Sequence, residues 1–309
     1  MSGAGRFAPS PTGPLHLGNL RTALVAWLFA RRSGRRFVVR MEDLDRHTSS
    51  REWEERQLAD LAALGLDWDG EVVRQSDRFD LHRSALARLT DAGRTYRCWC
   101  TRREVAEAAA PHDGLPRYPG TCRGLSDADV AEREASGRPA AVRLRADHAE
   151  LAFDDAVHGT VTGRPDDVVL LRNDGVPAYQ LAVVVDDGDQ GIDQVVRGDD
   201  LLDSTPSQIH LATLLGIDVP SYAHVPLVLG PDGQRLAKRS PFPAPGPSAS
   251  GSLAASSSGP GAGVAVRDLL ADSLGIGGLG TGDIDDLLDA FDPAALPTKP
   301  WTFSADGSR

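Results

Sequence analysis

The chain has 309 residues, of which 41% are hydrophobic and 25% charged, as is usual for a globular protein of about two domains. With 44 acidic and 33 basic residues, its net charge of −11 requires any nucleic-acid partner to bind a local basic patch. No apolar run approaches the roughly 20 residues of a membrane span, and residues 1–5 do not resemble a secretory signal, so we expect a cytoplasmic protein without membrane contact.

The first hundred residues predict alternating strands and helices. Apolar residues recur at helical spacing after His16, and Ser49 with Glu52 has the spacing of a capping box at the start of a second helix. This alternation predicts an α/β fold, a Rossmann-type doubly wound parallel sheet that binds ligands beyond the carboxyl ends of its strands. We expect strands at 6–8 and 37–41, and helices at 17–33 and 49–64.

The composition changes several times along the rest of the chain. Residues 95–178 are rich in short strands, turns and charge, and they carry all three cysteines. The apolar run 181–185 predicts a buried strand, and a helix should begin near Ser204 and end before Gly216. Residues 240–266 contain no charge and resemble a linker. We expect a catalytic core at 1–94 and 179–240, an inserted subdomain at 95–178, a low-complexity linker or insertion at 241–266, and a small helical segment at 267–309.

The loop 6–19 is rich in proline and glycine and leads directly into the first predicted helix. It delivers His16 and the backbone of Gly18 to a helix N-terminus, where free amides and the helix dipole favour a phosphate group. The alternative is an ordinary turn before a surface helix, in which His16 is an incidental cap.

A second basic loop, Gln234–Ser240, follows the turn at 230–233. A loop of this kind can close on a triphosphate and stabilise the charge that develops during nucleotidyl transfer. The alternative is a solvated basic loop. Lys238 is one of only two lysines in the chain, which favours a functional role.

The two loops together resemble the paired signatures of class I aminoacyl-tRNA synthetases. The first, "HIGH", is matched by His16-Leu17-Gly18-Asn19, and the second, "KMSKS", by Arg235-Leu236-Ala237-Lys238-Arg239. The resemblance covers about residues 5–240 and implies that family's catalytic core. Segments similar to the glutamate-specific branch are 6–19, 41–45, 177–182 and 196–206.

The resemblance also implies a site for glutamate and one for ATP with Mg²⁺. The glutamate-binding residues would be Arg6, Ser10, Glu42, Tyr179 and Arg197. The ATP-binding residues would be His16, Gly18, Asn19 and Lys238, of which His16 and Lys238 would be catalytic. Arginines can bind both carboxylates of glutamate and an acidic residue its ammonium group, so the residue types suit that substrate. The glutamate carboxylate would attack the α-phosphorus of ATP, giving glutamyl-adenylate and pyrophosphate without a protein nucleophile.

Three cysteines at short range suggest a structural zinc site. Cys98, Cys100 and Cys122 supply three thiolates, one fewer than a tetrahedral site needs. The resemblance implies Tyr118 as an unusual fourth ligand, whereas His112 is the chemically more ordinary candidate. The alternative is a set of buried free cysteines.

Only about 69 residues follow Ser240, too few for a separate anticodon-binding core. The chain therefore looks like the truncated branch of the family, the glutamyl-Q tRNA(Asp) synthetases. That resemblance implies activation of L-glutamate without tRNA, and its transfer to the queuosine base in the anticodon loop of tRNA(Asp), by a monomer. Two alternatives stay open: a catalytic fragment that charges the tRNA 3′ end, and a degenerate paralogue that binds RNA or a partner. The degenerate paralogue is kept as an alternative because the proline-rich residues 241–245 depart from the family pattern after the KMSKS-like loop.

Overall fold

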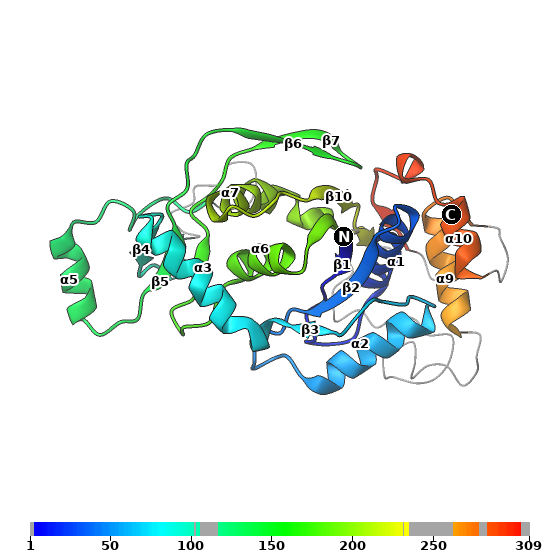
Figure 1. Ribbon diagram of the computed structural model, residues 1–309, viewed down its shortest axis with the longest axis horizontal. Helices are drawn as coiled ribbons and strands as arrows, with labels where there is room; N and C mark the ends of the chain where they lie inside the picture. Colours follow the sequence, from blue (N-terminus) through cyan, green and yellow to red (C-terminus); the bar gives the residue numbers. More distant parts are fainter. Residues whose placement is uncertain are drawn as a thin grey trace.

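A twisted, mostly parallel sheet forms the centre of the computed structural model, which describes residues 3–101, 103–105, 117–230, 232–234, 262–277 and 283–303 (Figure 1). Within these residues the sheet has seven strands in the order β3-β2-β1-β9-β10-β6-β7, and all neighbours are parallel except the β6–β7 hairpin. The strands are β1 (Ala4–Phe7), β2 (Arg36–Met41), β3 (Val73–Arg74), β6 (Leu151–Asp155), β7 (Gly159–Gly163), β9 (Ile192–Gly198) and β10 (Ser221–Val225).

Helices cover both faces of this sheet. On β2 the side chains of Phe37, Val39 and Met41 pack in the cluster that contains α1, whereas Val38 points the other way and packs in a cluster with Ile209 of α7. This alternation is the signature of a sheet buried on both faces, and the predicted doubly wound α/β fold is confirmed. The helices are α1 (Leu17–Arg32), α2 (Arg51–Ala63), α3 (Phe79–Asp91), α6 (Tyr179–Asp189) and α7 (Thr205–Leu215), with 3₁₀ turns η1 (Gln75–Arg78) and η2 (Asp199–Ser204).

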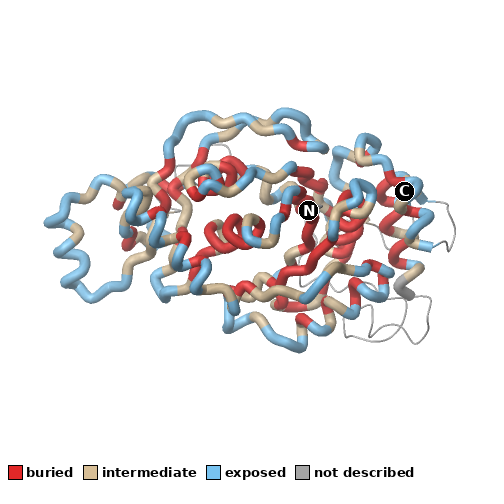
Figure 2. Tube along the Cα trace, in the orientation of Figure 1, coloured by how far each residue is buried: buried red, intermediate tan, exposed pale blue. Residues whose placement is uncertain are grey.

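A smaller antiparallel sheet lies at one end of the molecule (Figure 1). It has the order β4-β5-β8, and helix α5 projects beyond it with every residue exposed or half-buried (Figure 2). The hairpin β6–β7 lies within residues 95–178, the expected inserted subdomain, but it extends the main sheet because β6 pairs with β10. The bounds are β4 (Thr95–Cys98), β5 (Ala141–Leu144), β8 (Val169–Leu171) and α5 (Asp127–Ala135).

The segment 181–185 is helical, so the strand predicted there is wrong. It forms the middle of α6, and Leu181 through Val185 are all buried. Contacts with α3, α7, β8 and β9 surround the helix, so it does not need a polar face. A helix buried all round loses the 3.6-residue pattern, and its β-branched residues then favour a strand prediction.

The second helix begins one residue later than the predicted capping box. Ser50, not Ser49, is the N-cap of α2, and its hydroxyl accepts a hydrogen bond from the backbone N–H of Trp53. The prediction for α7 is confirmed, since it starts at Thr205 and ends at Leu215, directly before Gly216, whose φ of 66° suits a glycine.

The C-terminal segment packs on α1 at the opposite end from α5 (Figure 1). Phe291 and Phe29 meet edge to face with ring centroids 5.3 Å apart. The short strands β11 (Val228–Leu229) and β12 (Trp301–Thr302) pair in parallel. Among the described residues no helix is both long and apolar enough to cross a bilayer. The elements here are α9 (Ala262–Ser273), which starts inside the expected linker, α10 (Ile284–Ala290) and η3 (Pro293–Ala295).

Candidate active site

Three charged side chains converge where neighbouring parallel strands end. Arg6 lies on β1, Arg197 on β9, and Glu42 directly follows β2. They face a cavity of about 270 Å³ at the carboxyl edge of the sheet, the place where ligands bind in such folds. The structure brings these sequence-predicted residues together around this cavity: Arg6, Ser10, His16, Gly18, Asn19, Glu42, Tyr179 and Arg197.

The loop that forms one wall of the cavity is fixed by α2. The buried amide of Gln57 donates from Nε2 to the carbonyl oxygens of Ser10 (3.1 Å) and Gly13 (2.8 Å), and the backbone N–H of Ser50 donates to Pro11 (3.0 Å). Proline and glycine leave few internal hydrogen bonds in such a loop, so these external donors hold its shape. Gln57 was missed by sequence reasoning, because a glutamine on an amphipathic helix gives no functional signal.

His16 is the N-cap of α1 and forms a reciprocal capping box with Asn19. Nδ1 of His16 accepts from the Asn19 backbone N–H, and the Asn19 side chain accepts from the His16 backbone N–H, both at 3.3 Å. A Cβ atom on Gly18 would lie 3.1 Å from the His16 ring, so a side chain there would press on it. The N-terminus of α1 therefore lines the cavity through His16, Gly18 and Asn19, and the dipole at a helix N-terminus favours a phosphate group.

Glu42 is a largely buried carboxyl group, with 12% of its side chain exposed. Burial raises its pKa to about 7, although the nearby guanidinium groups of Arg40 and Arg6 favour the ionised form. Arg40 lies 3.9 Å away and is mainly engaged by Asp187 at 2.8 Å. Glu42 is thus an incompletely compensated acid that a cationic ligand group would stabilise.

Arg197 is buried, with 5% exposed, and its hydrogen-bond partners are neutral groups. Nε donates to Nε2 of His224 (3.1 Å), Nη1 to the amide oxygen of Gln208 (2.7 Å), and Nη2 to the hydroxyl of Thr205 (2.9 Å). Its guanidinium carbon also lies 5.6 Å from the ring centroid of Tyr222. No carboxylate of the described residues forms an ion pair with it, so its charge is available to an anion in the cavity.

Behind Arg197 lies a buried carboxylate–histidine pair that sequence reasoning also missed. Oδ2 of Asp155 is 2.6 Å from Nδ1 of His224, and the same carboxylate accepts three backbone N–H groups, those of Val157, His158 and His224. These bonds lower the pKa of Asp155 against the effect of burial, and burial lowers the pKa of His224. The imidazole is therefore neutral at neutral pH beside an ionised aspartate.

A second, larger cavity of about 760 Å³ adjoins the first. Ser10, Glu42 and Tyr179 line both, so the two cavities share a wall. The second cavity extends to the small antiparallel sheet, and its lining includes polar, basic and aromatic side chains. Among them are Asp45, Trp99, Arg138, Arg143, Arg172 and Asn173.

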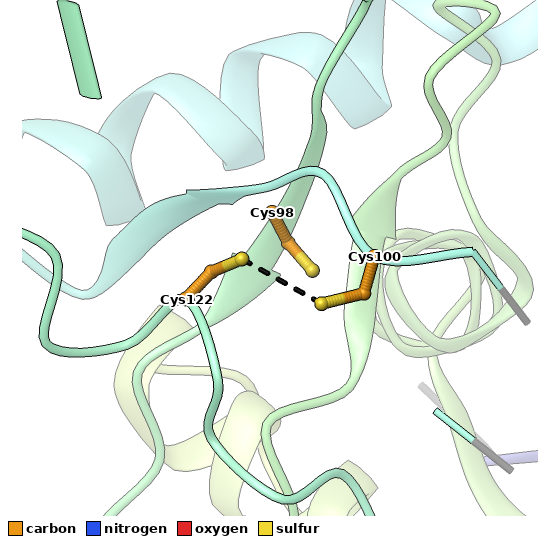
Figure 3. Close-up of side chains that lie close together, drawn as sticks. All are labelled: Cys98, Cys100 and Cys122. Carbon is orange, nitrogen blue, oxygen red and sulfur yellow. Dashed lines mark hydrogen bonds between the residues drawn. The ribbon is translucent and has the colours of Figure 1, made fainter. Parts of the chain in front are cut away.

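The three cysteine side chains lie close together (Figure 3), and two of them, Cys98 and Cys100, line the second cavity. Their sulfur atoms all lie within 4.8 Å of one another, and those of Cys100 and Cys122 are 3.6 Å apart. The hydroxyl of Tyr118 is 3.3 Å from Cys98 Sγ and 3.6 Å from Cys100 Sγ, which places a fourth donor atom beside them. Three sulfurs and one phenolic oxygen at this range fit the four ligands of a tetrahedral zinc ion.

Two predicted site residues cannot be placed. Lys238, expected to bind ATP, and His112, the alternative zinc ligand, both lie outside the described residues. The described residues before Lys238 end at Gln234. Its carbonyl oxygen accepts a hydrogen bond from the Gly230 backbone N–H, in the turn that precedes the second signature.

Comparison with known proteins identifies the family. Residues 4–241 match the catalytic domain of the class I tRNA synthetases described as "E and Q". The chain belongs to this family of class I tRNA synthetases. As such it is a ligase, and family members use ATP.

Two relatives indicate where the synthetase falls within the family. It is 58% identical over 308 residues to a glutamyl-Q tRNA(Asp) synthetase of Nocardia farcinica, covering 99% of this chain and 95% of that protein. It is 48% identical over 241 residues to a glutamate–tRNA ligase of Nitratidesulfovibrio vulgaris, of which it spans only half. The expected resemblance to the glutamyl-Q tRNA(Asp) synthetases is therefore confirmed.

Solved structures agree with this placement. The synthetase superimposes on a glutamate-tRNA synthetase from Elizabethkingia anophelis with a TM-score of 0.82 at 26% identity, covering 99% of this chain and 69% of that one. A glutamate tRNA ligase from Elizabethkingia meningosepticum, solved in complex with its amino acid, gives a TM-score of 0.81 at 27% identity, covering 99% and 68%. The C-terminal segment on α1 is thus included in the shared fold.

Proposed function

We propose that this synthetase activates L-glutamate with ATP and then transfers it to the queuosine base in the anticodon of tRNA(Asp). The observation that carries the first step is the set of charges around the smaller cavity. Arg197 and Arg6 offer two cations, the second with its Nε 3.5 Å from the carboxylate of Asp187, and Glu42 offers one anion. This set complements the two carboxylates and one ammonium group of glutamate. The printed name of the Nocardia farcinica relative supports the second step.

The chemistry needs positioning and charge stabilisation rather than a protein nucleophile. Glu42 holds the substrate ammonium group, and the arginines hold the carboxylates, so that one carboxylate oxygen faces the α-phosphorus of ATP. His16 and the first turn of α1 bind the phosphates beside Gly18 and Asn19. Attack forms the carboxyl–phosphate bond of glutamyl-adenylate and releases pyrophosphate, and Lys238 stabilises the charge on the leaving group.

The larger cavity supports an RNA partner for the second step. It adjoins the adenylate site through Ser10, Glu42 and Tyr179, and it brings arginines together in a chain whose net charge would otherwise repel RNA. Tyr179, which is half-buried on the wall that the two cavities share, provides an aromatic ring on which a base can stack. We propose that a nucleotide of the anticodon loop enters there and takes up the glutamyl group.

The cysteine cluster and Tyr118 would hold a structural zinc ion at the far edge of this cavity. When bound, the ion would link the end of β4, where Cys98 and Cys100 lie, to the turn at Cys122. The chain's own contacts already support this arrangement, since the backbone N–H of Cys122 donates to the Tyr118 hydroxyl at 2.9 Å.

Two assays test the proposal. The first is ATP–pyrophosphate exchange without tRNA, which should occur with glutamate and not with glutamine or aspartate. The second uses labelled glutamate and tRNA(Asp) that lacks its 3′-terminal nucleotide, prepared with queuosine or with guanosine in the anticodon. Labelling of the queuosine form alone is expected. Labelling that requires an intact 3′ end would assign the chain to 3′-end charging instead, and no exchange under any condition would refute an activating enzyme.

A further inference from the structure

The side chain of Arg197 is held by a relay that begins on a different part of the sheet. Arg197 on β9 and His224 on β10 are paired in register, and Asp155 ends β6, the strand on the other side of β10. These three residues are 27 to 69 positions apart in sequence, yet they form a continuous buried line of hydrogen bonds from Asp155 to His224 to Arg197. The line ends at the wall of the smaller cavity.

The hydrogen bonds define which nitrogen of His224 carries the proton. The ionised carboxylate of Asp155 can only accept, so Nδ1 of His224 must donate to it. In a neutral imidazole this leaves Nε2 as an acceptor, and Nε2 lies 3.1 Å from Nε of Arg197 and 3.1 Å from the hydroxyl of Thr205. A hydroxyl can donate or accept, so the contact with Thr205 suits either tautomer, whereas Arg197 does not. Arg197 can only donate, so the tautomer set by Asp155 is the one that Arg197 needs.

We propose that Asp155 and His224 are positioning residues for Arg197: the carboxylate fixes the histidine tautomer, and the histidine fixes the guanidinium plane that binds a carboxylate of the substrate. The identity of that substrate as glutamate rests on the proposed function above. Neutral partners at Nε, Nη1 and Nη2 orient the guanidinium without neutralising it, which an aspartate in direct contact would do.

The change Asp155→Asn tests the relay because it should reverse the tautomer. Oδ1 of Asp155 accepts the backbone N–H groups of Val157 and His158 at 2.9 and 3.0 Å, so the amide oxygen of asparagine must stay there. Its NH₂ group then replaces Oδ2 and donates to Nδ1 of His224, which moves the imidazole proton to Nε2. The backbone N–H of His224, which donates to Oδ2 at 3.0 Å in the wild type, keeps Oδ1 as its acceptor at 3.3 Å. Two donors would face each other, and Arg197 would lose its Nε partner.

The tautomer is measured directly by ¹⁵N NMR of histidine-labelled protein. We expect a protonated Nδ1 and an unprotonated Nε2 in the wild type, and the reverse in Asp155→Asn. In the exchange assay, KM for glutamate should rise roughly ten- to a hundred-fold, the range for loss of one hydrogen bond to a charged group, with KM for ATP within about twofold. Asp154→Asn is the matched control, since its side chain is exposed and accepts from the Thr160 hydroxyl (2.8 Å), away from the relay. This control should change neither the tautomer of His224 nor the KM for glutamate.

A second pair of variants tests the same proposal without relying on the folding of Asp155→Asn. The amide oxygen of His224→Gln reaches the place of Nε2 and can accept from Arg197, whereas the shorter His224→Asn reaches only the place of Nδ1. KM for glutamate should therefore rise much less in the glutamine variant. Equal effects of the two variants, or a reversed tautomer with unchanged KM, would overturn the proposal. If the wild type does not use glutamate at all, the proposed function fails, while the tautomer measurement still decides whether the relay exists.

Discussion

Replacing Glu42 by glutamine should weaken glutamate binding and, at the same time, stabilise the free protein. The carboxyl group is nearly buried, and its pKa in the folded protein, about 7, is far above its ordinary value of 4.5. Ionising Glu42 therefore costs folding free energy, which only a bound ammonium group would recover. The glutamine side chain is nearly isosteric and needs no ionisation, and Arg40 keeps its partner Asp187 in the variant.

The size and the sign of the effect follow from the two pKa values. Because the folded-state pKa is the higher one, the wild type loses stability as the pH rises from 4.5 to 7, and the neutral variant does not. The difference of about 2.5 pKa units corresponds to at most about 3 kcal/mol above pH 7, and to about 1 kcal/mol at pH 5. The variant should therefore be the more stable protein, increasingly so as the pH rises.

Urea unfolding at pH 5 and pH 8 measures this difference, and ATP–pyrophosphate exchange measures binding. The wild-type KM for glutamate should be about tenfold higher at pH 6 than at pH 8, since a carboxylate with a pKa near 7 is largely protonated at the lower pH. In Glu42→Gln, KM should be at least about tenfold higher at pH 8 and nearly independent of pH. Glu55→Gln, the same change at an exposed position on α2, is the control. A glutamine variant that is less stable than the wild type at pH 8 would refute the reasoning.

Three further changes test other parts of the site. Tyr118→Phe removes the hydroxyl beside Cys98 and Cys100 and should weaken zinc binding at least about tenfold in a competition with a chromophoric chelator, whereas His112→Ala should not. His16→Asn keeps a good N-cap, so unfolding should be nearly unchanged while exchange falls by about 100-fold; His16→Ala should in addition lose about 1 kcal/mol of stability. Arg197→Lys keeps the charge but cannot satisfy three acceptors in one plane, so KM for glutamate should rise by about 100-fold; an unchanged KM would argue against its role.

The parts of the site that a local pattern encodes could be predicted from the sequence. The loop before His16 and the cap of α1 depend on residues that are neighbours in the chain, and the structure places them together at one cavity. Arg6, Glu42 and Arg197 were expected at one site only through the resemblance to the glutamate-specific branch. The strands near Arg6 and Glu42 were predicted from local pattern, but β9, which carries Arg197, was not.

The parts that depend on distant pairing could not be predicted. Asp155 and His224 come together only because β6 pairs with β10, across 69 residues of sequence, and nothing near either residue indicates that pairing. The error at 181–185 has a related cause: α6 is surrounded by other elements that the local sequence does not reveal, so its apolar run lacked helical periodicity.

The pairing of β12 with β11 makes Trp301 a built-in optical reporter. The indole is half-buried, its backbone pairs in register with Val228, and Val228 forms part of the cavity wall near Gly18. A shift of that wall when ATP binds would be transmitted to the Trp301–Phe303 ring pair, whose centroids are 5.8 Å apart, and would change the indole emission. With the tryptophans at 27, 53, 68 and 99 replaced by phenylalanine, the fluorescence of a single residue near the C-terminus would follow nucleotide binding in real time.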